Sequence, residues 1–141
     1  MVKLLLGRGE VNPDKPDNSG RTPLSRAASW GNETAVKMLL GLEKVNPDKP
    51  DNSGRTPLLH AARLGHVEVV KIPLGRKEVS PDKPDNSGRT PLSYAAERGE
   101  NLIAIILLGR EEVNPDKPDN YGKTPRMFAA PCRNMTWMAL L

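Results

Sequence analysis

The stretch Val11–Leu24, VNPDKPDNSGRTPL, decides the fold, because the chain repeats it at a fixed spacing. The same letters stand at Val45–Leu58, VSPDKPDNSGRTPL stands at Val79–Leu92, and VNPDKPDNYGKTPR stands at Val113–Arg126. Each copy begins 34 residues after the one before it. A period between about 20 and 50 residues is typical of chains built from stacked structural units. We therefore expect one domain over 1–141, with a partial repeat at 1–10, full repeats at about 11–44, 45–78 and 79–112, and a degraded partial repeat at 113–141.

Each unit is predicted to be a helix, a tight turn, a second helix and a polar arm. In the first copy Thr22 suits the N-cap of a helix, and Pro23 suits the first helical position. Gly31 is expected to end this helix, and a second apolar stretch reaches to about Gly41. Paired alanines in the first helix allow neighbouring helices to approach closely. The letters NPDKPDNSG combine two prolines with Asp, Asn and Gly, which predicts an extended arm with a turn.

A family resemblance follows from the order of these landmarks. Gly54–Gly75, GRTPLLHAARLGHVEVVKIPLG, is similar to the ankyrin repeat, with its G-x-T-P-L, A-A, G-H and V-V-x-x-L-L landmarks. The resemblance covers nearly the whole chain and implies an all-α, ankyrin-type solenoid of stacked helix-turn-helix units with projecting Pro/Asp/Asn-rich loops. The sequence departs from the family in its 34-residue period and in the residues that replace the histidine usual after T-P-L, which are Ser25, Leu59, Ser93 and Met127. The arms also resemble repeat tails of large fungal signalling proteins.

Three features depart from the regular pattern. Pro73 lies within the second helix of the second copy, where an interior proline costs about 3 kcal/mol, so we expect a kink or a shortened helix near Val69–Gly75. In the fourth copy Arg126 replaces a buried leucine, and Arg133 occupies the turn position of a glycine. Both chain ends align with the middle of a unit, which favours a segment of a longer array over a complete small protein.

Composition narrows the class of protein. The net charge is +4, aromatic residues make up 4% of the chain, and Cys132 is the single cysteine. One cysteine disfavours a disulfide scaffold. The opening letters MVKLLLGRGE hold too short an apolar run for a signal peptide or a membrane span. We expect a cytoplasmic protein, with the nucleus left open and no membrane partner.

The residue types needed for catalysis are scarce. His66 lies in the turn between helices, where the resemblance implies a structural role, and we expect a structural role for His60 also. Cys132 lies in the most degraded copy. A zinc site takes about four nitrogen or sulfur ligands, and only these three residues offer them. No phosphate-binding loop is present. We therefore predict no enzyme, no cofactor, no metal and no small-molecule substrate.

Paired aspartates such as Asp14 and Asp17 recur in every arm. They could bind a divalent cation or act as acid and base. Because they flank a lysine, the preferred interpretation is a solvated turn whose charges compensate locally.

The resemblance implies a concave binding face made of the arm tips and the exposed side of the first helices. The tips are almost identical between copies, whereas the ends of the first helices all differ, so the latter should carry most of the specificity. The partner-binding candidates are Arg21, Trp30, Arg55, Arg63, Leu64, Arg89, Glu97, Arg98, Tyr121 and Lys123. For Trp30 the alternative is that it covers the neighbouring repeat.

Charge decides between classes of partner. Arg21, Arg55, Arg89 and Lys123 form a row of cations that could attract phosphates, but an aspartate of each arm forms an adjacent row of opposite sign. The two rows are expected to pair, which disfavours nucleic acid or another polyanion. The sequence thus predicts a non-catalytic protein–protein interaction module. The alternative is a structural spacer or a fragment of the repeat tail of a larger signalling protein.

Overall fold

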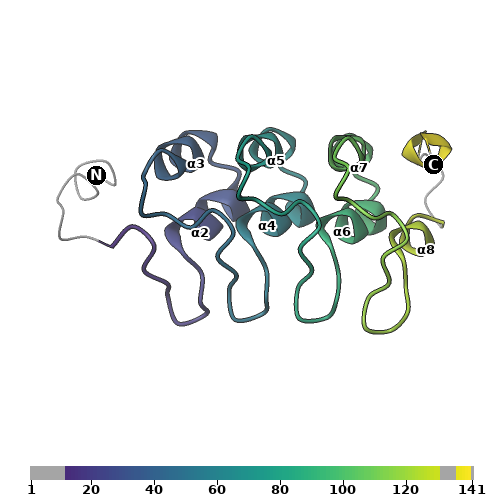
Figure 1. Cartoon of the computed structure of the whole chain (residues 1–141), viewed down its shortest axis with the longest axis horizontal. Coiled ribbons are helices and arrows are strands. Elements are labelled where there is room, and N and C mark those ends of the chain that lie inside the picture. The colour runs from purple at the N-terminus through teal and green to yellow at the C-terminus, as the bar shows by residue number, and fades with distance from the viewer. Residues whose placement is uncertain (1–11, 131–135, 141) are drawn as a thin grey trace.

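The computed structural model describes residues 12–130 and 136–140, which form two rows of short helices and one row of arms (Figure 1). The first helices are α2 (Pro23–Trp30), α4 (Pro57–Leu64), α6 (Pro91–Arg98) and α8 (Pro125–Ala129). The second row holds α3 (Glu33–Leu40), α5 (Val67–Leu74), α7 (Asn101–Leu108) and the 3₁₀ helix η1 (Thr136–Leu140). No strand occurs within the described residues. The predicted all-α solenoid is confirmed.

Local signals in the sequence set the helix ends as predicted. The threonine before each first helix accepts a hydrogen bond from the backbone N–H three residues later, at 3.2 Å for Thr22 and Thr56. A proline follows at the first helical position. Gly31, Gly65 and Gly99 end the first three of these helices with φ of 70°, 79° and 72°, which glycine adopts without strain.

Small side chains bring the rows of helices together. Ala61 and Ala62 are fully buried in α4, as are Ala95 and Ala96 in α6. Each first helix packs on the first helix of the next repeat, and each second helix packs on the next second helix. The buried leucines, valines and alanines of all repeats therefore join into one continuous core.

The fourth repeat is irregular at its first helix. Arg126 stands where Leu24, Leu58 and Leu92 are buried, and it forms an ion pair with Asp116 at 2.6 Å. The helix α8 spans only five residues. Trp137 of η1 is fully buried and packs beside α7. Arg133, like the partial repeat at 1–10, lies outside the described residues.

The arms lie side by side and bond to one another (Figure 1). The backbone N–H of Asn52 donates to Ser19 O at 3.0 Å, and its side-chain amide donates to Asn18 O at 3.1 Å. The same pair of bonds recurs at Asn86 and Asn120. The outer end of the arm adds a third link, because Asp14 accepts the backbone N–H of Asn46 at 3.2 Å.

The prediction of solvated arm carboxylates is wrong for most of them, although Asp17 is only half-buried and Asp116 is exposed. Five of them are buried, namely Asp14, Asp51, Asp82, Asp85 and Asp119. Burial raises the pKa of Asp82, although the backbone N–H of Asn114 and the nearby Lys117 oppose that shift. Backbone N–H groups serve as hydrogen-bond donors to these carboxylates, from the next arm for Asp14 and Asp82 and from their own arm for the other three.

Pro73 does not shorten its helix, so that part of the prediction is wrong. The helix α5 has eight residues, as α3 and α7 have. The disturbance lies in the last turn, where Gly75 N–H donates to Ile72 O at 3.2 Å. In α3 the equivalent Gly41 N–H donates one residue further back, to Lys37 O at 3.1 Å. Because Pro73 is the last residue but one, its missing N–H removes a single helical bond.

Replacing Pro73 with leucine should stabilise the protein. Leucine is buried at the equivalent positions, Leu39 and Leu107, so the new side chain has a place in the core. We expect Pro73→Leu to raise the free energy of unfolding by about 2 kcal/mol, measured by urea denaturation followed by circular dichroism. The reverse change, Leu107→Pro, should lower it by at least as much. A Pro73→Leu protein no more stable than the parent would contradict this account.

A glycine in the arm tests the contact between arms. Gly54 has φ of +77°, and a Cβ added there would lie 2.4 Å from Asn86 Oδ1 and 2.8 Å from Asn86 N. Gly122 is the matched control, because its φ is +79° and nothing described lies within 4 Å of such a Cβ. Gly122→Ala should cost about 1–2 kcal/mol of backbone strain. Gly54→Ala should cost about 2 kcal/mol more, since hydrogen bonds from Asn86 are also lost. Equal melting temperatures for the two variants would show that the arms do not support one another.

Candidate functional site

The arm tips and the first helices border one continuous surface, which we call the inner face. It comprises residues 17–21, 51–55, 85–89 and 119–123 together with α2, α4, α6 and α8 (Figure 1). This is the surface that the resemblance predicts to be concave.

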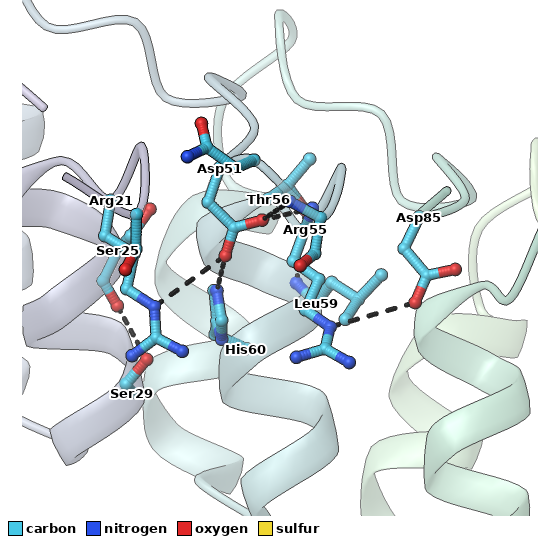
Figure 2. Close-up of polar contacts among 12 residues, drawn as sticks. Arg21, Ser25, Ser29, Asp51, Arg55, Thr56, Leu59, His60 and Asp85 are labelled. Carbon is cyan, nitrogen blue, oxygen red and sulfur yellow. Dashed lines mark hydrogen bonds and ion pairs between the residues drawn. The ribbon is translucent and has the colours of Figure 1, made fainter. Parts of the chain in front are cut away.

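One aspartate in each arm shapes the tip of the inner face. Asp51 Oδ1 accepts the backbone N–H groups of Ser53 and Arg55, both at 2.9 Å. Its Oδ2 faces the first helix and meets His60 Nε2 at 2.8 Å (Figure 2). Burial opposes ionisation of Asp51, but the hydrogen bonds from Arg55, His60 and Ser53 outweigh it and hold the pKa of this carboxyl below its usual value.

The first three repeats each supply a different partner for this aspartate, always nine residues further along the chain. Arg26 donates to Asp17 at 2.9 Å, and the Tyr94 hydroxyl donates to Asp85 at 2.5 Å. In the fourth repeat the position is Phe128, which has no polar group. Arg26, His60 and Tyr94 were not among the predicted site residues, although the constant nine-residue spacing from each aspartate was a signal for them.

The predicted pairing of the arginine and aspartate rows is confirmed for the first three arms. Arg21 Nε lies 3.8 Å from Asp51 Oδ2, and Arg55 Nε lies 3.8 Å from Asp85 Oδ2. Each arginine therefore pairs with the aspartate of the next repeat. Figure 2 shows the terminal nitrogens of both arginines pointing away from these carboxylates.

Arg89 has different surroundings. Its guanidinium lies 4.0 Å from the centre of the Tyr94 ring and 4.2 Å from the centre of the Phe128 ring. It also donates to Glu97 at 2.7 Å. Two rings and one carboxylate thus hold this side chain in a fixed position.

Four of the ten predicted residues meet around Arg89. Arg89, Glu97, Tyr121 and Lys123 line one hollow of about 370 Å³. The other lining residues are Ser87, Tyr94, Asp119 and Phe128. The Tyr121 side chain stands at the edge of this hollow with 84% of its surface exposed.

Arg63 and Arg98 add positive charge to the ends of α4 and α6. Partial burial lowers the pKa of Arg63, and the neighbouring Arg55, Arg98 and Arg21 lower it further. Neither Arg63 nor Arg98 forms an ion pair with any residue that the structure describes. Leu64 follows Arg63 in α4 and is partly exposed.

Trp30 is not brought together with the hollow beside Arg89. It lies on α2, at the other end of the described stack, with 72% of its surface exposed. There it borders an apolar hollow of about 230 Å³ between α2 and α3, lined also by Pro23, Ala27 and Leu39.

Both histidines have structural hydrogen bonds, as predicted. His60 is fully buried against Asp51. His66 Nε2 lies 2.8 Å from Ser29 O and so links the second repeat to the first. The remaining candidate nucleophile, Cys132, lies outside the described residues.

Comparison with known families agrees with this architecture. A family model described as "Ankyrin repeats (3 copies)" matches residues 1–77, and one described as "Ankyrin repeat" matches residues 87–120. The chain belongs to the ankyrin repeat family, whose members are generally protein–protein interaction modules and typically non-catalytic. None of the curated proteins compared with the chain matches it.

Two kinds of feature are absent from the residues that the structure describes. No helix among them is both long and apolar enough to span a bilayer. No three of their His, Cys, Asp and Glu side chains are grouped so that they could hold a metal ion.

The burial of His60 predicts a stability that depends on pH. Burial lowers the pKa of His60, although Asp51 opposes the shift. The buried Nδ1 has no hydrogen-bond partner within the described structure, so an N–H formed there on protonation would find no acceptor. The unfolded chain therefore binds more protons than the folded protein once the pH falls below about 6.5. Stability should accordingly fall as the pH is lowered from about 7 to 5.

His60→Tyr should remove this component, because Tyr94 shows that a tyrosine hydroxyl can bond the arm aspartate without titrating in that range. The converse variant, Tyr94→His, should steepen the loss. Chemical denaturation at several pH values measures both. The same pH profile for His60→Tyr and the parent would contradict the assignment.

Proposed function

We propose that this chain is a non-catalytic recognition module that binds an intracellular protein partner through the inner face. The observation that carries the proposal is the hollow around Arg89, where four predicted contact residues converge. The general role of ankyrin repeats in protein–protein interaction supports it.

The chemistry of the hollow suits protein recognition. Aromatic and arginine side chains contribute most of the binding energy in many protein interfaces. Arg89 is already held between two rings, so a partner does not have to immobilise it. Tyr121 offers a large exposed surface with few rotatable bonds, and Lys123 and Glu97 supply opposite charges beside it.

The inner face has a uniform scaffold and variable contact residues. Arm tips of nearly one sequence hold it in shape, while the first helices present a different side chain in each repeat. Contact residues that differ from repeat to repeat favour recognition of one partner over the role of a structural spacer.

A matched pair of variants tests the proposal. Tyr121→Ala removes an exposed side chain of the inner face, and Lys37→Ala removes an exposed side chain of α3, which belongs to the second row of helices. Partners are captured from a lysate of the source cells at increasing protein concentration and quantified by mass spectrometry. We expect at least one protein to be captured saturably by the parent and by Lys37→Ala, and at least tenfold less by Tyr121→Ala.

Circular dichroism melting of each variant shows whether the fold is retained. If no protein is captured saturably, or if Tyr121→Ala and Arg63→Ala both bind as the parent does, the inner face is not the binding site and the structural spacer becomes the better interpretation.

A further inference from the structure

Three arginines on the inner face form a row with one member in each repeat. Arg21, Arg55 and Arg89 stand at the same position of successive arms, 34 residues apart. A ring from a first helix stands beside each of them. Figure 2 shows the His60 ring between Arg21 and Arg55, and Arg89 lies between Tyr94 and Phe128.

The arm aspartates do not use up the hydrogen-bonding capacity of this row. Asp51 already accepts hydrogen bonds from the backbone N–H groups of Ser53 and Arg55 and from the His60 ring. Its distance of 3.8 Å from Arg21 Nε is too long for a hydrogen bond. The same distance separates Arg55 Nε from Asp85. The aspartates therefore orient the Arg21 and Arg55 guanidinium groups through charge, and the terminal nitrogens point away from these carboxylates, with Arg55 also beside the Tyr94 hydroxyl.

The row remains accessible to a ligand. The Arg21 side chain is 36% exposed and the Arg55 side chain 27% exposed. Arg89 is less exposed and already gives one terminal nitrogen to Glu97. Planar guanidinium groups that are fixed in orientation match carboxylates in a two-point geometry.

The spacing of the row defines which ligand fits it. Packed helices lie about 8–10 Å apart. Each arginine directly precedes the threonine that caps one of the first helices, so the arginines follow the spacing of these helices. An extended peptide advances about 3.3 Å per residue, and a polyproline II chain about 3.1 Å. Three residues of such a chain therefore cover about 10 Å, which is the step from one arginine to the next.

We propose that the inner face binds an extended segment of a protein partner that carries Asp or Glu at every third position. Its successive carboxylates bind Arg21, Arg55 and Arg89. This inference rests on the proposed function and specifies the chemistry of the partner. Arg63 and Arg98, which have no ion pair within the described structure, strengthen the attraction for an acidic segment.

Charge density separates this ligand from nucleic acid. One strand of a DNA duplex carries a charge about every 3.4 Å, roughly three times more densely than the arginines are spaced. The carboxylates Asp51, Asp85 and Glu97 lie between the arginines and would repel the phosphates that fall opposite them. A segment with uncharged residues between its acids avoids this repulsion.

Synthetic peptides test the register directly. Fluorescently labelled peptides of equal length and composition carry four glutamates at every second, every third or every fourth position, with serine and proline between them. Their binding to the intact chain is measured by fluorescence anisotropy at low and at physiological salt. We expect the every-third peptide to bind at least tenfold more tightly than the other two.

Variants locate the binding. Arg55→Gln should weaken binding of the every-third peptide at least tenfold. Arg55→Lys should weaken it less, since lysine keeps the positive charge but cannot form the two-point contact of a guanidinium group. The control Lys37→Gln removes one positive charge from α3 in the second row of helices and should leave binding unchanged. Should an arginine variant fail to fold, the spacing series on the parent protein still decides the question.

Two results would overturn the inference. The first is equal binding of the three peptides, or binding that Arg55→Gln leaves unchanged. The second is tighter binding of a single-stranded oligonucleotide of equal charge, which would make the row a polyanion site. If the first result is obtained, protein capture that depends on Tyr121 would still support the proposed function. A failure of the predicted spacing is therefore distinguishable from a failure of the proposed function.

Discussion

A carboxylate held inside each arm is the interaction on which the rest of the structure depends. Asp51 uses one oxygen to accept two backbone N–H groups of its own tip and the other to meet a first helix. Without it, those N–H groups would be left without partners in a partly buried turn, which costs about 1–3 kcal/mol for each group. The lowered pKa of Asp51 reflects the same balance, because hydrogen bonds to the ionised form outweigh the cost of burying it.

The same carboxylate also connects repeats, and this explains why the arms are nearly identical. Asp51 attracts Arg21 of the preceding arm, while the tip that it shapes receives hydrogen bonds from the following arm. A substitution in one tip is therefore felt by the arms on both sides. In an array whose stability comes from nearest-neighbour contacts, such a tip tolerates little variation. Mutual fit gives a physical reason for the repetition that does not depend on how recently the repeats were duplicated.

Local patterns predicted the fold because helix ends are local events. A threonine cap, a proline at the first position and a glycine at the end need only neighbouring residues, and all were read correctly for α2. Burial of Asp14 was missed, since the adjacent Lys15 suggested solvation, whereas the group that bonds its carboxylate is Asn46 of the next arm. A related limit applies to Trp30. Each position along a helix rotates the side chain by about 100° around the axis, so the sequence pattern left open whether Trp30 faces a partner or covers the neighbouring repeat.

The hollow around Arg89 arises where the pattern of aspartate partners ends. Arg26, His60 and Tyr94 each bond the aspartate of their own arm, and Phe128 is the first residue in this series that cannot. Within the described residues Arg89 forms no ion pair with Asp119, unlike the two earlier arginines with the aspartates that follow them. It stacks instead between two rings and turns to Glu97. The candidate site thus lies where the first helix carries an apolar ring in place of a partner for the arm aspartate, and that ring, with Tyr94, holds Arg89 at the wall of the hollow.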